Sequence, residues 1–240
     1  MASPSEWPCS ISQREAQSYS RMDLGFEIYD AVLSVEECTS LGNALSDSKA
    51  SGRAGKRHLM KEPFVESIAR DERLMTLARQ WVGDEATPYR ATLFEKSGSA
   101  NWLVVWHQDT ALPLESKFES DHWGPWSSKE GIKYAHAPSE ALERVIALRI
   151  HLDSSTESNG PLKVIPGSHS LGVLEDGAVF ERAHISESAN CLTSAGGVVA
   201  MRPLLIHASS KAQTDAPRRV LHIEYAENIE IAENIRLAIA

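Results

Sequence analysis

The sequence predicts a mainly β protein: a double-stranded β-helix of the jelly-roll, cupin-like type, flanked by α-helices on its N-terminal side. Three observations lead to this expectation. Short segments rich in β-formers recur between residues 89 and 225, separated by Gly, Pro and Asn. The segment 143–153 alternates between an apolar and a partly polar face, as a strand beside a barrel interior does. Both segments with helical spacing precede these strands.

Size and composition indicate a single domain over residues 1–240, with a loosely ordered tail over residues 1–21. Hydrophobic residues make up 42% and charged residues 24%, as in soluble globular proteins. We expect no secretion signal, and no apolar run reaches the roughly 18 residues that a membrane span needs. The net charge of −9 argues against a nucleic-acid partner. Cys9, Cys38 and Cys191 are interpreted as free thiols, which favours the cytoplasm.

The N-terminal part contains a short predicted strand and two predicted helices. The strand-like stretch 25–29 leads into a helix that Ser34 caps and whose apolar stripe ends at Leu45. A second helix is expected over 66–82. Between the helices, residues 51–61 include two glycines and five basic residues, counting the histidine. This loop is either a solvated face or a binding loop for an anionic substrate group.

The remaining strands follow in order, interrupted by one long segment. Residues 111–138 contain no long periodic pattern but hold several aromatic residues, and we expect a lid or pocket wall there. The predicted strands cover residues 89–96, 102–106, 143–153, 162–165, 198–201, 204–207 and 219–225.

The motif His107-Gln108-Asp109 carries the chemistry. On an extended strand His107 and Asp109 lie on one face, where they supply two of the three ligands of a facial triad for a divalent metal, usually Fe(II). His207 is the candidate third ligand. The pair His151 and Asp153 has the same spacing, so spacing alone does not choose between the two sets. Asp153 has an ordinary turn role in its surroundings, which favours the first set.

Three blocks of sequence resemble the phytanoyl-CoA dioxygenase-like family of Fe(II)/2-oxoglutarate oxygenases. They are residues 106–109, residues 159–169, which include Asn-Gly-Pro-Leu and Ile-Pro-Gly-Ser-His, and residues 207–225. The resemblance extends over roughly residues 26–226. It implies a jelly-roll oxygenase that uses Fe(II), 2-oxoglutarate and O2.

The resemblance also implies roles for individual residues. The metal ligands are His107, Asp109 and His207. Arg218, eleven residues after the distal histidine, takes the position of the arginine that binds the distal carboxylate of 2-oxoglutarate, and Ser209 matches a hydroxyl that assists it. Gln108 and Trp126 are further candidates for cosubstrate binding. Arg219 is expected on the opposite side of the strand from Arg218.

The expected reaction is hydroxylation of an unactivated C–H bond, or a related desaturation or cyclisation, with release of succinate and CO2. Halogenating members of the resembling family have a small residue at the position of Asp109, so oxygenation is preferred. Two other classes remain: a cupin-like metal enzyme that does not use 2-oxoglutarate, and a non-catalytic binding module on the same fold. Arg218 with Ser209 argues against the former, and the complete triad against the latter.

The expected partner is a small metabolite with a carboxylate, such as an amino acid, and the sequence leaves the oligomeric state open. We expect a clamp between the basic loop and the aromatic segment, with Arg149 adding a cation inside the barrel. The candidate substrate-binding residues are Arg53, Arg149, Trp123 and Tyr134. The alternative is that the basic loop is solvated and the tryptophans pack in the core.

Overall fold

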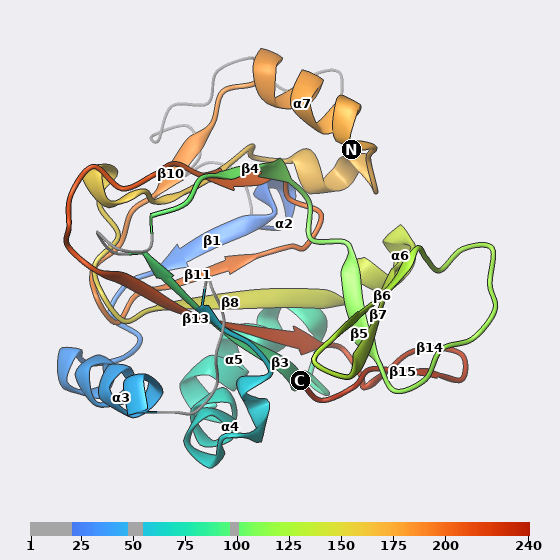
Figure 1. Ribbon diagram of the computed structural model, residues 1–240, viewed down its shortest axis with the longest axis horizontal. Helices are drawn as coiled ribbons and strands as arrows, with labels where there is room; N and C mark the ends of the chain where they lie inside the picture. Colours follow the sequence, from blue (N-terminus) through green and yellow to red (C-terminus); the bar gives the residue numbers. More distant parts are fainter. Residues whose placement is uncertain (1–20, 48–54, 97–100) are drawn as a thin grey trace.

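The computed structural model describes residues 21–47, 55–96 and 101–240. Two antiparallel sheets form a β-sandwich, with strand orders β1-β11-β8-β13-β3-β2 and β10-β9-β12-β4 (Figure 1). Helices cover the outer face of the larger sheet, and α7 lies over the smaller one (Figure 1). The predicted jelly roll with N-terminal helices is confirmed.

The strands lie close to their predicted positions. The larger sheet contains β1 (Phe26–Tyr29), β2 (Gly55–Lys56), β3 (Thr87–Lys96), β8 (Val145–His151), β11 (Val198–Met201) and β13 (Arg218–Ala226). The smaller sheet contains β4 (Val104–His107), β9 (Leu162–Val164), β10 (Ala189–Cys191) and β12 (His207–Ser209). The strand expected over 204–207 begins only at His207, because the Leu205 amide closes a turn by donating to the Arg202 carbonyl.

The N-terminal region is helical where the sequence predicts helices, but it contains more and shorter helices than the two expected. The described helices are α2 (Arg21–Leu24), α3 (Val35–Asp47), α4 (Pro63–Ala69), α5 (Glu72–Val82), α6 (Ser139–Leu142) and α7 (Asp176–Ile185), with 3-10 turns at Leu59–Lys61, Glu157–Asn159 and Ser168–Leu171. The single helix expected over 66–82 was wrong. Asp71 interrupts it, because its carboxylate accepts the Arg73 amide and caps a new helix. The Ser34 cap is confirmed, since its hydroxyl accepts the Glu37 amide.

The alternation along β8 separates the two sides of the larger sheet. Ile146, Leu148 and Ile150 are buried in the cluster between this sheet and the helices. Each such fully buried side chain stabilises the fold by about 1.5–3 kcal/mol. Arg149 and His151 take the intervening positions, and they are also buried. Polar side chains therefore point into the interior of the sandwich, where a ligand can reach them.

Residues 111–138 are not the long loop that the sequence suggested. They form a separate antiparallel sheet, in the order β5-β7-β6, from β5 (Ala111–Leu114), β6 (Trp126–Lys129) and β7 (Ile132–His136). Glu130 and Gly131 connect β6 to β7 with φ values of 51° and 86°, as a two-residue hairpin turn requires. Short strands of this kind carry too few residues to show a period in the sequence.

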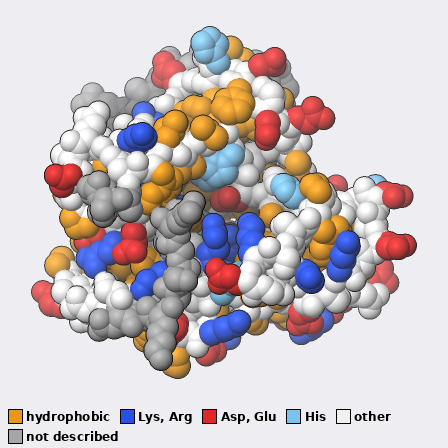
Figure 2. All heavy atoms as spheres, in the orientation of Figure 1, with side chains coloured by type: hydrophobic (Ala, Val, Ile, Leu, Met, Phe, Trp, Pro, Cys, Tyr) orange, Lys and Arg blue, Asp and Glu red, His pale blue; other side chains and the backbone are white. Residues whose placement is uncertain are grey.

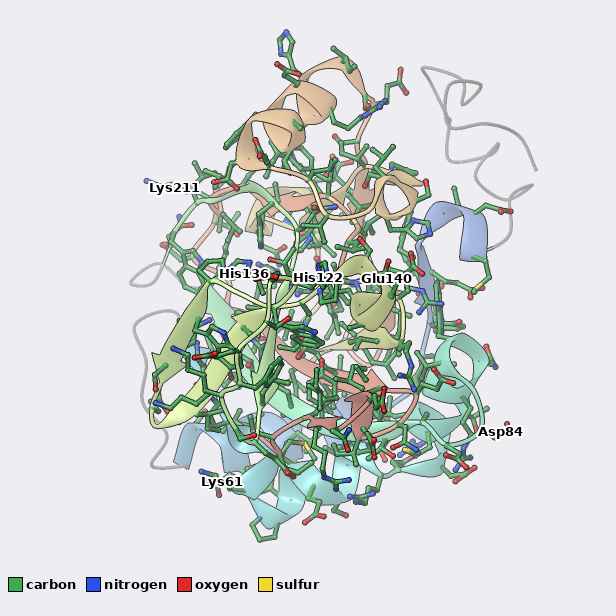
Figure 3. The ribbon with its side chains drawn as sticks, turned by 90° about the vertical axis from the view of Figure 1, so that its right-hand side faces the viewer. Lys61, Asp84, His122, His136, Glu140 and Lys211 are labelled. Carbon is green, nitrogen blue, oxygen red and sulfur yellow. The ribbon has the colours of Figure 1, made fainter. Side chains whose placement is uncertain are left out.

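Figure 3 shows the layers from the side. The helical layer, with Lys61 and Asp84 near its edges, lies at one end of the molecule and α7 at the other, while His136 marks the end of β7 (Figure 3). A hairpin of β14 (Glu230–Ala232) and β15 (Ile235–Arg236) borders the three-stranded sheet through a bridge between Leu114 and Leu237.

Parts of two predictions lie outside the described residues. These are the loosely ordered tail, apart from Arg21, which begins α2, and the part of the basic loop that contains Arg53. The described part of that loop forms β2, which pairs with β3, and a 3-10 turn. Among the described residues, we find no helix with the length and apolar character needed to cross a membrane.

Candidate metal centre

Two histidines from distant parts of the sequence meet in the smaller sheet. His107 and His207 are direct partners in the antiparallel pair β4–β12, and their ring centroids are 4.2 Å apart. Asp109 follows β4, where its amide donates to the Pro203 carbonyl. One ligand atom from each of the three side chains lies within 4.8 Å of the others. The structure thus brings together the three residues that the sequence singles out as metal ligands.

Backbone contacts set the tautomer of both histidines. Nδ1 of His107 lies 2.8 Å from the Val105 carbonyl, and Nδ1 of His207 lies 2.8 Å from the Leu205 carbonyl. A carbonyl only accepts, so each Nδ1 carries the proton and each Nε2 keeps its lone pair. Such outer contacts orient metal-binding imidazoles in proteins. Both Nε2 atoms face Asp109, at 3.8 Å from Oδ1 for His107 and 3.5 Å from Oδ2 for His207.

The electrostatics keep these donors in the forms that bind a cation. Burial lowers the pKa of His207 to about 4, so this imidazole is neutral at pH 7. Burial opposes ionisation of Asp109, but His207 and His107 hold the pKa of its carboxyl well below the usual range. The Nε2 atoms of two imidazoles and one carboxylate on one face fit a divalent ion of the Fe(II) type.

Gln108 separates the two ligands of the motif and points elsewhere. Its side-chain Nε2 donates to the carbonyls of Leu204 and Gly172, at 2.7 and 2.9 Å, and its Oε1 accepts the Leu174 amide at 2.9 Å. One of these contacts holds the backbone just before His207, and the other two hold the segment 172–174. The structure does not bring Gln108 to the cosubstrate side of the centre, where the family resemblance suggested it.

The two residues of the rival pair, His151 and Asp153, have different surroundings and do not form a common site. Both carboxylate oxygens of Asp153 bind the guanidinium of Arg219, with contacts of 2.8 Å to Nε and Nη2. His151 is fully buried, on the inner side of β8. Arg219 therefore faces away from the interior, as the alternation along its strand predicts, and Asp153 is engaged outside the sandwich.

A pocket for an anion lies deeper inside. Arg218 and Lys96 are register partners on β13 and β3, and the side chain of each is almost completely buried. The Ser209 hydroxyl accepts from Lys96 Nζ at 2.7 Å and from Arg218 Nη2 at 3.4 Å, while it donates to the Gly160 carbonyl at 2.8 Å. Arg149 approaches from β8, with its guanidinium 5.4 Å from the centre of the Phe94 ring.

Three buried cations, Lys96, Arg149 and Arg218, make this pocket suitable for a negatively charged ligand. Among the described residues, Arg218 Nε and Nη1 and Arg149 Nε are buried without a hydrogen-bond partner. Burial, and then the neighbouring arginines, lower the pKa of Lys96 to about 8, and burial lowers that of Arg218 to about 10. Buried donors in proteins are normally satisfied, so these unpartnered N–H groups fit a carboxylate ligand such as one end of 2-oxoglutarate.

Figure 2 shows the opening of this interior. Histidine and acidic side chains border a hollow, and a group of Lys and Arg side chains lies across from them (Figure 2).

The aromatic candidates lie on or beside the three-stranded sheet. Trp123 packs in the apolar cluster under that sheet, with its ring 5.8 Å from Phe118, and Trp126 contacts the same phenylalanine at 5.2 Å. The rings of both tryptophans pack in or against this apolar cluster, so neither tryptophan reaches the anion pocket. Tyr134 is buried on β7, where its hydroxyl lies 2.9 Å from His58 Nε2.

Several polar residues of the interior were not predicted from the sequence. Lys96 and Arg90 share the inner face of β3, and His222 and Glu224 share that of β13 with Arg218. A signal was present, because these polar residues lie an even number of positions apart along each strand, which places them on one face. The same alternation predicted the partly polar face of β8, which pairs with β13, and β13 in turn pairs with β3.

Comparison with known proteins identifies relatives of this chain. Ectoine dioxygenase of Sphingopyxis alaskensis is 28% identical over 184 residues, which cover 69% of this chain and 53% of that protein. L-Proline trans-4-hydroxylase of Streptomyces griseoviridis is 29% identical over 178 residues, which cover 63% of this chain and 59% of that protein. The chain thus spans between half and two thirds of the length of these curated relatives.

Solved structures show the same fold. The crystal structure of EctD from S. alaskensis with bound Fe has a TM-score of 0.64 at 25% identity, and the match covers 92% of this chain and 79% of that one. The structure of EctD with 2-oxoglutarate and 5-hydroxyectoine has a TM-score of 0.66 at 22% identity, covering 94% and 79% of the two proteins. The model of the phytanoyl-CoA dioxygenase (PhyH) family matches residues 29–220, so the chain belongs to this family.

Proposed function

We propose that the protein is an Fe(II)/2-oxoglutarate-dependent oxygenase that hydroxylates an unactivated C–H bond of a small metabolite. One observation carries the proposal: the cluster of His107, Asp109 and His207 borders an interior whose buried arginine donors are unpartnered. A metal enzyme that did not use a dicarboxylate cosubstrate would have no need of Arg218 in this place. The relatives named as a dioxygenase and a hydroxylase support the same reaction class.

The metal ligands would be His207 Nε2, His107 Nε2 and one oxygen of Asp109. Three protein ligands on one face leave the remaining positions for the cosubstrate and O2. Bound together, Fe(II), 2-oxoglutarate and O2 supply the oxidant for the C–H bond, and 2-oxoglutarate is converted to succinate and CO2. The side chain of Asp109 fills the position that must be small for a halide, which favours oxygenation.

The protein's own residues would bind and orient the cosubstrate. Arg218 would donate to its distal carboxylate through Nε and Nη1, while Lys96 and Ser209 would contribute a charge and a hydroxyl. Charge-assisted hydrogen bonds of this kind are short and directional, so they fix the 2-oxo end toward the metal. The buried end of the pocket around Arg218 and Lys96 would keep water away from the distal carboxylate.

The substrate would be a small molecule with a carboxylate, such as an amino acid. The interior holds more buried cations than 2-oxoglutarate alone compensates, which favours a second anionic group on the substrate. We retain Arg149 and Tyr134 as candidate contacts, while Arg53 lies outside the described residues. We place the enzyme in the cytoplasm on the basis of its buried thiols, Cys38 and Cys191.

Anaerobic titration with Fe(II) and 2-oxoglutarate tests this function. A metal-to-ligand charge-transfer band should form in the wild type and be absent in His207→Ala. Admission of O2 should then release succinate, and a small carboxylate substrate should accelerate the release. If the band does not form with wild-type protein, the proposal fails; if the band forms without succinate release, the protein is a binding module.

A further inference from the structure

A second polar cluster lies on the inner face of the larger sheet. Arg90 on β3 and Glu224 on β13 are register partners, and Arg90 Nη1 lies 3.2 Å from Glu224 Oε2. Their side chains are 17% and 6% exposed, so this is a buried ion pair. His222 adjoins it, with Nε2 3.3 Å from the other oxygen of Glu224.

This pair is too far from the anion pocket to serve the same ligand. Glu224 follows Arg218 by six positions on β13, a separation of about 20 Å along an extended strand. A five-carbon dicarboxylate cannot span that length. Arg149 lies between the two groups, since its Nη1 is 3.1 Å from His222 Nδ1. The inner face therefore has an anion pocket at one end and the Arg90–Glu224 pair at the other.

The pair lies near the metal centre. The guanidinium of Arg90 donates from Nη1 to the carbonyl of Ala111 at 3.5 Å, and Ala111 is two residues beyond Asp109. Arg90 and His222 are also among the groups that lower the pKa of Asp109. A molecule bound against the pair would consequently lie next to the metal, on the side away from Arg218.

Several polar atoms of this cluster are available to a ligand. Among the described residues, no donor forms a well-aligned hydrogen bond to the buried Glu224 Oε2, although Arg90 and the Tyr89 hydroxyl both lie near this carboxylate. The contacts of Arg90 to described residues run through Nη1, which leaves Nε and Nη2. Buried polar groups in native proteins are normally satisfied, so a ligand that donates to Glu224 and accepts from Arg90 completes the cluster.

A second cation extends the subsite toward the hairpin of the three-stranded sheet. The Tyr134 ring lies between Arg90 and Lys129, with distances of 5.4 Å and 4.7 Å from the ring centroid to the guanidinium carbon and the ammonium nitrogen. Lys129 is half-buried; burial and then Arg90 lower its pKa. Two cations beside one carboxylate would attract a carboxylate ligand that also carries a positive nitrogen.

We propose, as an extension of the oxygenase function above, that Arg90 and Glu224 form the substrate subsite and select a zwitterionic amino acid. The cationic nitrogen of the substrate donates to Glu224 Oε2. Its carboxylate accepts from Arg90 Nε and Nη2 and faces Lys129. Opposite charges fixed at one end of the substrate direct the C–H bonds at its other end toward the metal.

The test compares free amino acids with derivatives that lack one charge. The Fe(II)- and 2-oxoglutarate-loaded enzyme is incubated with the proteinogenic L-amino acids, their N-acetyl derivatives and their amides, and succinate release is measured above the substrate-free rate. At least one free amino acid should accelerate release. Its N-acetyl derivative and its amide should each be about tenfold to a hundredfold less effective, the loss expected for one charged hydrogen bond.

Glu224→Gln identifies the residue responsible. This isosteric change should lower kcat/KM for the free amino acid by about tenfold or more. It should also reduce the ratio of kcat/KM for the free amino acid to kcat/KM for its N-acetyl derivative. The affinity for 2-oxoglutarate, read from the anaerobic charge-transfer band, should stay near the wild-type value. Glu227→Gln is the matched control, because Glu227 lies just beyond the same strand but pairs on the surface with Arg144.

The remaining outcomes would contradict the subsite, the substrate class or the oxygenase function. If wild type uses N-acetyl derivatives or amides as well as free amino acids, or if the two Gln variants behave alike, the subsite is not the one proposed. If the charge-transfer band forms but no amino acid perturbs it or accelerates succinate release, the substrate class is wrong while the oxygenase function stands. Absence of the band in wild type would contradict the oxygenase function itself.

Discussion

His107 and His207 face each other across the β4–β12 pair, and each donates its Nδ1 proton to the carbonyl two residues before it. The two rings therefore have the same tautomer, oriented by the same local contact. Such a site is largely formed before a metal arrives, because these backbone contacts orient both rings although the side chains of His107 and Asp109 are partly exposed. Preorganisation of this kind makes metal affinity depend on the contacts that hold the ligands as well as on the ligands themselves.

We expect Asp109→Ala to lose Fe(II) binding and oxygenation while the protein stays folded. The side chain is half-buried at the edge of the smaller sheet and contributes little to the core. Anaerobic titration with Fe(II) would measure metal binding, and circular dichroism would show whether the variant is folded. Turnover at the wild-type rate in this variant would contradict the proposed ligand set.

Asp153→Ala is the matched control, because Asp153 belongs to the rival motif. This change removes a partly exposed pair with Arg219, so we expect a stability loss of up to about 1 kcal/mol. Fe(II) binding should remain unchanged. Loss of iron in Asp153→Ala with retention in Asp109→Ala would show that the wrong motif was chosen.

The outcome for these two motifs illustrates what the sequence can and cannot provide. Periodicity predicted the strands, and therefore which side chains share a face, because a strand has a side-chain period of two. It could not distinguish His107 and Asp109 from His151 and Asp153, since the spacing is identical. The structure separates them through Arg219, a partner 66 residues away from Asp153 that local sequence does not reveal.

Short and irregular elements were the hardest to predict. The segment 111–138 forms a sheet whose strands have only four or five residues, too few for a clear alternation. The break between α4 and α5 rests on one capping contact of Asp71. Arg149 and Arg218 lie on the longer strands β8 and β13, where more residues make the alternation clear. His107 and His207 lie on short strands and were identified from their motif and the family resemblance instead.

Arg218→Ala should raise the concentration of 2-oxoglutarate required, whereas Arg219→Ala should have a much smaller effect. Loss of one partner of a buried charge-assisted pair costs on the order of 2–5 kcal/mol. Arg219 binds Asp153 on the other side of the strand and does not reach the interior. The apparent affinity from the charge-transfer band measures the difference. Equal effects of the two changes would contradict the assignment of strand faces.

Cosubstrate affinity should fall as the pH rises above about 8, the pKa to which burial and nearby arginines lower Lys96. A dicarboxylate favours the charged ammonium, so deprotonation weakens binding by up to about tenfold per pH unit. The unliganded protein should instead gain stability from this group as the pH rises through 8, because the unfolded state binds more protons there.

Anaerobic calorimetry with 2-oxoglutarate from pH 7 to pH 9 would measure the pH effect on affinity. Lys96→Met should bind more weakly at pH 7 and lose this dependence. A flat profile in the wild type would exclude Lys96 from the cosubstrate pocket.

Gln108→Leu should reduce iron affinity although Gln108 is not expected to touch the metal. Its amide joins the His107–Asp109 segment to the carbonyl of Leu204, three residues before His207. Loss of such supporting contacts typically lowers metal affinity by about 10–100-fold. A competition assay with a chelator would measure the change. If iron affinity is unaltered while 2-oxoglutarate affinity falls, Gln108 belongs to the cosubstrate site after all.

Gly160→Ala should weaken cosubstrate binding as well as stability, because the glycine is held close to the segment that carries Ser209. Its φ is +70°, and an added Cβ would lie 2.4 Å from the carbonyl oxygen of Ser210, a backbone atom that cannot turn away. The Gly160 carbonyl also accepts the Ser209 hydroxyl. A positive φ alone costs about 1–3 kcal/mol for a non-glycine residue. The displacement of Ser209 adds a loss in 2-oxoglutarate affinity.

Gly131→Ala separates these two effects. Gly131 also has a positive φ, +86°, but an added Cβ there would meet no atom within 4 Å. We therefore expect Gly131→Ala to lower the melting temperature through backbone strain and to leave 2-oxoglutarate affinity unchanged. Gly160→Ala should lower both. Thermal unfolding and the anaerobic charge-transfer titration give the two quantities. If Gly160→Ala lowers stability alone, the contact between its carbonyl and Ser209 does not position the cosubstrate pocket.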